Sequence, residues 1–282
     1  MAFQFLNRSI RLPSTSAEIA QRLSGVHDEW LMTDAERGTL RSLLSTCKPL
    51  CAIEVGVYRA GSLAMLSEFC QKVYALDIDP FCQATYASQF PNVEFITGPS
   101  HETLPKLIER MQSSGEALDF VLIDADHSGE GVRRDINNVL RYRPRRPLYI
   151  VMHDSFNPGC RGGMKAADWS SNPHAHMVEL DFVVGRFVTQ EEGDGYGQMW
   201  CGFGLGILLP EKRSGDVIIR ENESLTYRTA LRHSAYRFHK WWNPFYSVPQ
   251  AAYRARRTAA QILRTHAPQL FETLKARRSK SV

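Results

Sequence analysis

The stretch LCAIEVGVYRAGSLAML, residues 50–66, predicts the fold class of this chain. Its first part, Leu50 to Gly56, is a short apolar run that ends at a glycine, as buried strands do, and the residues from Ser62 onward have helical character. A strand that turns through glycines into a helix is the repeating unit of an α/β protein.

Four further apolar runs alternate with helical segments and predict more strands, at residues 72–79, 93–97, 118–124 and 147–154. This alternation predicts an α/β fold with a mostly parallel sheet and helices on both faces. Residues 181–209 then contain two apolar runs joined by a loop rich in Glu, Asp and Gly, which predicts an antiparallel hairpin at the edge of the sheet.

The ends of the chain differ from this central part. Two capping-box patterns, Thr15-x-x-Glu18 and Thr33-x-x-Glu36, predict N-terminal helices within residues 15–47. From Arg228 onward, twelve Lys or Arg residues face one acidic residue, so residues 228–282 carry +11 and residues 1–227 carry −7. We therefore expect one domain over residues 1–227, followed by a basic, aromatic-rich helical tail.

Composition limits the class of protein. The chain is 43% hydrophobic and 23% charged, and it contains no apolar run long enough to cross a membrane. The first residues lack the apolar segment and cleavage site of a secretory signal. Six scattered cysteines without a CxxC pair predict reduced thiols in a cytoplasmic protein. The acidic charge of residues 1–227 argues against a nucleic-acid binder.

The segment EVGVYRAGS, residues 54–62, has the features of a ligand-binding turn. Gly56 can let the backbone approach a ligand, and Gly61 lets the chain enter a helix whose first amides favour a carboxylate. Asp77 ends the next strand at the distance expected for a carboxylate that binds ribose hydroxyls. The GxGxxG pattern of dinucleotide enzymes is absent, and Glu54 suits a ligand with a sulfonium or ammonium group.

Taken in order, the motifs EVGVYRAGS, ALDIDP, LIDADHSGEGVRRDI and IVMHDS resemble those of class I S-adenosylmethionine-dependent methyltransferases. More narrowly, they are similar to the branch of small-molecule and sugar O-methyltransferases, near the cephalosporin hydroxylase-like proteins. The resemblance covers roughly residues 33–209 and implies a Rossmann-like methyltransferase sheet. For S-adenosylmethionine, it implies Glu54, Gly56, Gly61 and Ser62 at the methionine part, Asp77 at the ribose, Gly98 and Ser100 at the adenine, and Asp124 where cofactor and acceptor meet.

Polar residues behind the fourth and fifth strands are the candidates for catalysis. Asp124 and His127 follow one strand, and His153 and Asp154 end the next. A hydroxyl acceptor has to lose its proton to a general base or to metal coordination. His127 and His153 are the two candidate bases, because an imidazole titrates near neutrality.

The same residues predict a metal site. Asp124 and Asp154 would offer carboxylate oxygens to Mg²⁺, with His153 as a third ligand. The resembling branch often has an acid where this chain has His153, and an imidazole suits Mn²⁺, iron or zinc better than Mg²⁺. Asp124, His153 and Asp154 are thus the predicted ligands for Mg²⁺ or Mn²⁺, unless His153 serves as the base and the metal set is smaller.

Two nearby segments carry weaker predictions. Asp126 is a candidate N-cap for a helix that begins near Ser128. The Gly- and Pro-rich stretch HDSFNPGCRGGM, residues 153–164, predicts an irregular loop in which Asn157 and Arg161 shape the acceptor pocket.

These observations favour a methyltransferase that acts on a hydroxyl of a small molecule or glycan. One alternative is a nucleotide-dependent oxidoreductase on a Rossmann sheet. Another is a non-catalytic scaffold whose basic tail binds a membrane or a partner. The tail is compatible with contact to an anionic membrane surface, but packing on the acidic domain or in a homo-oligomer is favoured over membrane contact.

Overall fold

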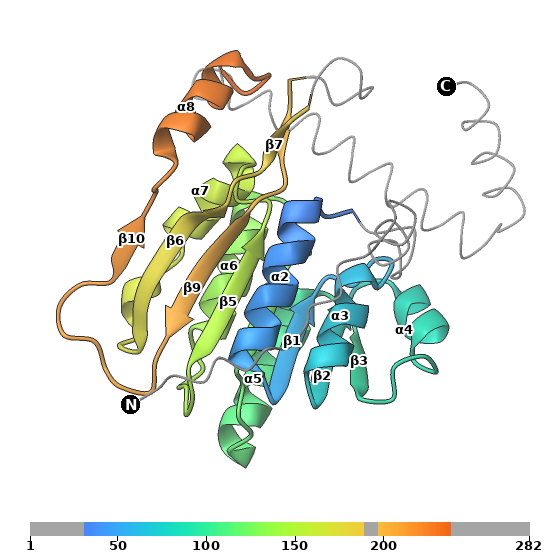
Figure 1. Cartoon of the computed structure of the whole chain (residues 1–282). Helices are drawn as coiled ribbons and strands as arrows, with labels where there is room; N and C mark the ends of the chain where they lie inside the picture. The colour runs from blue at the N-terminus through green and yellow to red at the C-terminus, as the bar shows by residue number, and fades with distance from the viewer. Residues whose placement is uncertain (1–30, 189–196, 238–282) are drawn as a thin grey trace, which may run out of the picture.

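The computed structural model describes residues 31–188 and 197–237, which form a sheet of eight strands with helices on both faces (Figure 1). The strand order is β10-β6-β9-β5-β4-β1-β2-β3. The strands are β1 (Cys51–Val55), β2 (Lys72–Asp77), β3 (Val93–Thr97), β4 (Phe120–Ile123), β5 (Leu148–His153), β6 (Ala175–Val183), β9 (Phe203–Leu208) and β10 (Ile218–Arg220). A separate ribbon pairs β7 (Arg186–Phe187) with β8 (Met199–Trp200).

Seven α-helices accompany the sheet in the described part of the chain. They are α2 (Asp34–Cys47), α3 (Gly61–Phe69), α4 (Pro80–Tyr86), α5 (Ser100–Ser114), α6 (Gly129–Val139), α7 (Pro158–Ala166) and α8 (Ser224–His233). The apolar faces of α2 and α3 pack on one side of the sheet, and those of α5 and α6 pack on the other. All strands of the sheet are parallel except β9, which runs antiparallel to both β5 and β6. The predicted fold class, with its antiparallel pair, is confirmed.

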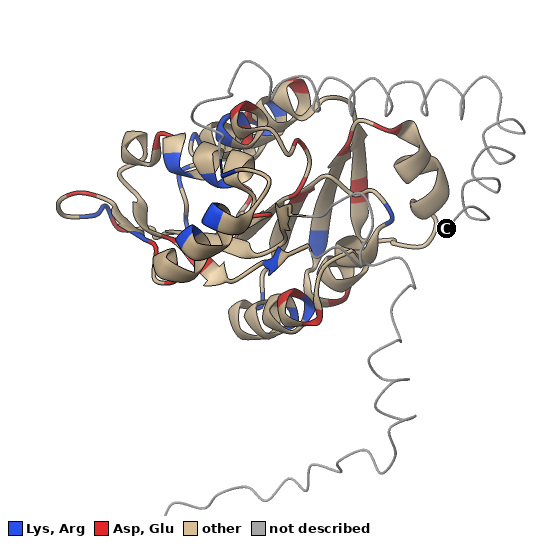
Figure 2. Ribbon diagram, turned by 90° about the horizontal axis from the view of Figure 1, so that it is seen from above, with Lys and Arg blue, Asp and Glu red and all other residues tan. Residues whose placement is uncertain are grey.

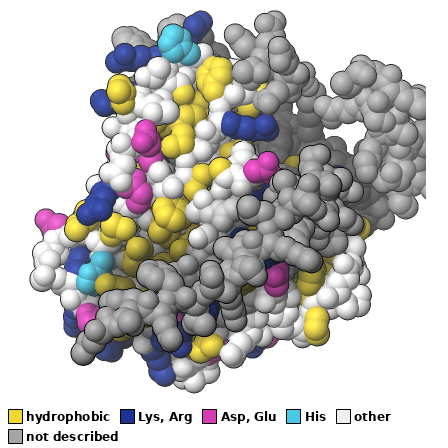
Figure 3. Space-filling view, viewed as in Figure 1, with side chains coloured by type: hydrophobic (Ala, Val, Ile, Leu, Met, Phe, Trp, Pro, Cys, Tyr) yellow, Lys and Arg dark blue, Asp and Glu magenta, His cyan; other side chains and the backbone are white. Residues whose placement is uncertain are grey.

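The strand at the far edge, β10, was not predicted. It pairs parallel with β6, so that Ile218, Met177, Ile207 and Tyr149 lie in register across four strands. Figure 3, viewed as Figure 1, shows hydrophobic side chains gathered on the face of the molecule that is seen in that view.

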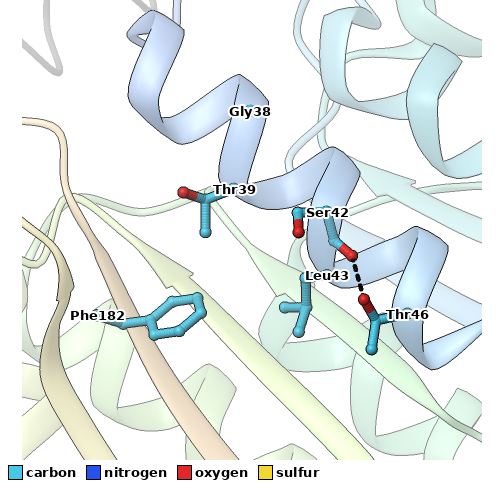
Figure 4. Close-up of a pocket in the computed structure, with 6 residues that line it drawn as sticks. All are labelled: Gly38, Thr39, Ser42, Leu43, Thr46 and Phe182. Carbon is cyan, nitrogen blue, oxygen red and sulfur yellow. Dashed lines mark hydrogen bonds between the residues drawn. The ribbon is translucent and has the colours of Figure 1, made fainter. Parts of the chain in front are cut away.

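A pocket of about 290 Å³ lies between α2 and Phe182 of β6, and Figure 4 shows its lining. None of the predicted site residues lines this pocket.

The predicted irregular loop after β5 is wrong, because residues 158–166 form helix α7. Asn157 caps this helix through Gly159 N and Cys160 N, and Pro158 occupies its first turn. Gly163 is needed for packing, since a Cβ there would lie 2.2 Å from the carbonyl oxygen of Gly129 in α6. Close contact between α6 and α7 therefore explains why a helix at this place has the glycine-rich composition that is typical of a loop.

The predicted N-terminal helix at Thr33 is confirmed as α2, with the capping box formed in both directions between Thr33 and Glu36. The helix expected at Thr15 and the tail from residue 238 lie outside the described residues. The expected boundary after residue 227 falls within α8. None of the helices in residues 31–188 and 197–237 has the length and apolar composition to span a bilayer.

Candidate active site

The turn between β1 and α3 joins the two halves of the site. Gly56 has a φ of 95°, and a Cβ there would lie 2.2 Å from the carbonyl oxygen of Asp124. Only glycine satisfies both the left-handed backbone and this close approach. The sequence predicted that Gly56 approaches a ligand, whereas in the structure its immediate neighbour is the end of β4.

Asp77, at the end of β2, holds the same turn. Its Oδ2 accepts hydrogen bonds from Val57 N at 2.9 Å and Tyr58 N at 3.0 Å, and its Oδ1 accepts one from Asp79 N at 2.8 Å. Each carboxylate oxygen can accept more than one hydrogen bond. Asp77 therefore shapes the turn and still has acceptor capacity for ribose hydroxyls.

Glu54 is a fully buried carboxyl group beneath this turn. Its Oε1 accepts a hydrogen bond from the Ser62 hydroxyl, while Oε2 has no hydrogen-bond partner among the described residues. Burial raises the pKa of Glu54 well above its usual range. An unpartnered buried carboxyl oxygen fits a cationic ligand group, because the two would compensate each other.

The start of α3 adds to this environment. Gly61 is the first residue of the helix, and the N-cap residue, Ala60, has no side chain that accepts a hydrogen bond. The first amides of α3 are thus not capped by a side chain, which fits a carboxylate ligand.

Exposed apolar side chains surround Asp77 and were missed by the sequence analysis. Tyr58, Ile78 and Phe81 are 48%, 52% and 50% exposed. On the other side of Asp77, its carbonyl oxygen accepts a hydrogen bond from Gly98 N at 2.9 Å, and Ser100 begins α5 shortly after. These side chains offer apolar surface on which a planar ring such as adenine can pack.

A histidine–aspartate pair lies at the ends of β4 and β5. His127 Nδ1 lies 2.8 Å from Asp154 Oδ2, and Asp154 Oδ1 accepts a hydrogen bond from Cys201 N at 2.6 Å. Asp154 and Cys201 both have left-handed backbones, with φ values of 60° and 64°. Strained backbone of this kind is concentrated at functional sites. The side chain of His127 is 34% exposed, so its ring reaches solvent beside a buried carboxylate.

His153 lies between two other carboxylates. Its Nδ1 is 2.9 Å from Asp124 Oδ1, and its Nε2 is 3.0 Å from Glu36 Oε1. The second contact is an ion pair without the geometry of a hydrogen bond. The His153 side chain is 8% exposed, whereas that of Asp124 is 23% exposed. His153 is thus mostly covered, and Asp124 is the part of this group that reaches the surface.

The electrostatics of these groups follow from burial and close charges. Burial lowers the pKa of His127, but the hydrogen bond and charge of Asp154 outweigh it and leave the pKa raised. Burial likewise opposes the charges of Asp124 and Asp154 at His153, whose pKa ends well above its usual value. Asp154 is buried, which raises its pKa, but the charge of His153 and the hydrogen bond from His127 lower it to about 2.

Glu36 is the most important site residue that the sequence analysis missed. It was identified only as part of a capping box, yet its side chain is fully buried beside His153 and accepts a hydrogen bond from Gly202 N at 2.6 Å. Trp200, whose ring lies edge-on to His127 with centroids 5.9 Å apart, was also missed. The one sequence signal available was the acidic residue of the capping box itself.

Three predictions about neighbouring residues are corrected. The N-cap of α6 is Ser128, which accepts a hydrogen bond from Gly131 N, while Asp126 accepts one from Ser128 N. Asn157 caps α7 and is buried, rather than lining a loop. Arg161 is buried as well and pairs with Asp181 Oδ1 at 2.6 Å, so it stabilises the fold instead of facing an acceptor.

The predicted metal ligands come together. Asp124, His153 and Asp154 each offer one ligand atom, and these atoms lie within 4.8 Å of one another. The set contains two carboxylates and an imidazole at the carboxyl ends of β4 and β5, and Figure 2 shows acidic residues among the strand ends seen from above. This donor set fits a divalent cation.

The comparisons with known proteins agree with this geometry. A family model described as "Methyltransferase domain" matches residues 53–155. These residues contain the glycine turn, Asp77, and the pair of His127 and Asp154. These residues form a methyltransferase domain. The resemblance to class I S-adenosylmethionine-dependent methyltransferases is confirmed, and this assignment favours that enzyme class over the oxidoreductase and the scaffold.

Among solved structures, the chain is similar to an O-methyltransferase from Bacillus cereus in complex with SAH. The identity is 15%, the match covers 71% of this chain and 93% of that one, and the TM-score is 0.48. It is also similar to the O-methyltransferase TomG from Streptomyces achromogenes in complex with SAM, at 15% identity, 72% and 93% coverage and a TM-score of 0.48. No curated protein sequence matches the chain.

Proposed function

We propose that this methyltransferase transfers a methyl group from S-adenosylmethionine to a hydroxyl of a small molecule or glycan. The observation that carries the proposal is the pair of His127 and Asp154, with Nδ1 and Oδ2 2.8 Å apart, at the strand ends beside the cofactor turn. A hydroxyl acceptor requires a base at this place, and an imidazole oriented by a carboxylate is a suitable one.

The cofactor is proposed to occupy the β1–α3 side. Bound S-adenosylmethionine supplies a methyl group on a sulfonium, which reacts once a nucleophile is aligned with it. The unpartnered Oε2 of buried Glu54 and the uncapped first amides of α3 would receive the ammonium and carboxylate groups. Asp77 would accept from the ribose hydroxyls, and the exposed apolar residues around it would contact the adenine.

On the acceptor side, His127 would take the hydroxyl proton at Nε2, since Nδ1 faces Asp154. Asp154 would stabilise the imidazolium that results, because Cys201 N and His127 hold its two oxygens in place. His153 is covered and bounded by carboxylates at both nitrogens, which favours His127 as the base. Between the two bases named from the sequence, we therefore propose His127.

Asp124, His153 and Asp154 would hold a divalent cation next to this base. When bound, such a cation acidifies a hydroxyl that it coordinates. Asp124 lies at the end of β4 in contact with Gly56 and so connects the cation site to the cofactor turn.

The test is titration calorimetry of the full chain with S-adenosylmethionine, followed by transfer of a radiolabelled methyl group to panels of hydroxylated and aminated acceptors. We expect binding of the cofactor and labelling of hydroxylated acceptors only. An absence of heat on addition of the cofactor would refute the proposal, and labelling confined to amines would refute O-methylation. Asp124→Ala and EDTA treatment should both lower turnover if a metal takes part.

A further inference from the structure

Glu36 makes contacts beyond those that cap its own helix. Its Oε2 accepts hydrogen bonds from Thr33 N at 2.6 Å and Thr33 Oγ1 at 2.8 Å, which completes the capping box. Its Oε1 accepts from Gly202 N at 2.6 Å and lies 3.0 Å from His153 Nε2. A fully buried carboxylate is costly unless it is compensated, and His153 is the positively polarised group next to it.

This contact leaves Nδ1 as the nitrogen of His153 that faces Asp124 and Asp154. With Nε2 directed at Glu36, Nδ1 lies 2.9 Å from Asp124 Oδ1 and 3.7 Å from Asp154 Oδ1. The ring is also held edge-on against Phe203, with centroids 5.7 Å apart. Nδ1 faces carboxylate oxygens, so it has to carry either a proton, which it donates to Asp124, or a metal ion.

The donor set also indicates which metal. Mg²⁺ prefers oxygen ligands alone, whereas an imidazole among carboxylates favours first-row transition ions. In metal sites, a histidine ligand commonly donates its other N–H to a carboxylate, which fixes the tautomer and the ring orientation. Glu36 lies on the Nε2 side of His153 as an ion-pair partner, with Oε1 3.0 Å from Nε2, and comes from α2, a helix before the methyltransferase motifs begin.

We propose that Glu36 is a positioning residue that directs His153 Nδ1 toward Asp124 and Asp154, and that this set binds Mn²⁺ or Zn²⁺ in preference to Mg²⁺. The inference rests on the proposed function only for the purpose of the metal, since binding can be measured without turnover. The alternative, in which protonated His153 itself supplies the positive charge, predicts no stoichiometric metal.

The first experiment measures metal content. The full chain is treated with a chelator, dialysed against Mn²⁺, Zn²⁺ or Mg²⁺ separately, and analysed by mass spectrometry for bound metal and by calorimetry for affinity. We expect one equivalent of Mn²⁺ or Zn²⁺ and binding of Mg²⁺ that is weaker by at least about tenfold. No retained metal, or equal binding of Mg²⁺, would overturn the inference.

The second experiment tests Glu36 against its role as a helix cap. Glu36→Gln should weaken metal binding roughly 10–100-fold, as loss of such an orienting carboxylate usually does. Thr33→Val removes the capping hydroxyl but leaves the contact with His153, so it serves as the matched control and should keep the wild-type affinity. If both variants lose metal equally, Glu36 acts through the helix and the positioning role is wrong.

A third variant tests selectivity. His153→Asp converts the set to oxygen ligands alone and should raise the affinity for Mg²⁺ relative to Mn²⁺. An unchanged preference would contradict the role given to His153. Calorimetry with S-adenosylmethionine separates the two proposals: cofactor binding without metal binding refutes only this inference, and metal binding without cofactor binding refutes only the proposed function.

Discussion

The proposed cofactor half of the site, around the β1–α3 turn, and the proposed acceptor half, around His127 and His153, depend on contacts between residues at very different separations in the sequence. In the cofactor half, Asp77 holds the turn at Val57, only 20 residues earlier. In the acceptor half, Glu36 accepts a hydrogen bond from Gly202, 166 residues later. The cofactor half is therefore one strand–turn–helix–strand unit, whereas the acceptor half exists only when α2, β4, β5 and β9 are packed together.

This difference predicts that the two halves can be damaged independently. Cofactor affinity should depend on local residues around the β1–α3 turn. Turnover and stability should depend on long-range contacts around α2, α7 and β9. The following predictions test that separation, in order of decreasing effect.

Asp77→Ala should have the largest effect and should act on the cofactor alone. It removes the proposed acceptor for ribose hydroxyls and the anchor of the turn at Val57 and Tyr58. Charge-assisted hydrogen bonds contribute about 1.5–3 kcal/mol each, so losing two weakens binding roughly 10²–10⁴-fold. Calorimetry with S-adenosylmethionine measures this. Asp79→Ala, which removes the cap of α4, is the control and should retain affinity. Equal losses in both variants would contradict a direct role of Asp77.

His127→Ala should lower turnover about 10²–10⁴-fold, the usual contribution of a general base. Cofactor affinity should stay at the wild-type value, because His127 contacts Asp154 and Trp200 and not the glycine turn. Turnover of the wild type should rise with pH as His127 loses its proton, with a midpoint above the ordinary histidine value because its pKa is raised. His233→Ala, on exposed α8, is the control. Turnover that survives in His127→Ala would assign the base elsewhere.

Arg161→Met should destabilise the fold by about 3–5 kcal/mol, since it leaves the carboxylate of Asp181 buried without its partner. Arg161 also contacts Glu221 and the ring of Tyr227, so it links α7 to the segment around α8. Urea denaturation measures the loss.

The control for Arg161 is Arg133→Ala. Arg133 pairs with Glu130 on the exposed face of α6, and exposed pairs contribute only about 0.2–1 kcal/mol. Similar losses in the two variants would show that burial does not determine the strength of these pairs.

Asp135→Asn should stabilise the protein at pH 7.5 by up to about 3 kcal/mol. Asp135 is buried in α6, and burial raises its pKa to about 6. A carboxyl whose pKa is raised by folding contributes fully below its unfolded value near 3.8, and this contribution is lost as pH rises through about 6. Thermal unfolding of both proteins at pH 4.5 and 7.5 tests this. A stability difference that does not grow with pH would refute the assignment.

Local patterns were sufficient for most of the fold. The five predicted parallel strands and α2 were found because apolar runs, glycine turns and a capping box are short-range signals. Helix α7 was missed because Gly163 serves close contact with α6, which no local pattern reports. Strand β10 was missed because its three residues are exposed and gain their place only by pairing with β6.

By itself, the sequence determined the class of sheet, the glycine turn and the acids and histidines at the strand ends, because each belongs to one contiguous segment. Only the tertiary structure decided what those groups do. It buried Glu36 against His153, paired His127 with Asp154, and set Cys201 N against that same carboxylate. Such contacts depend on the order of strands in the sheet, in which β9 returns beside β5, and this order is a property of the packed fold.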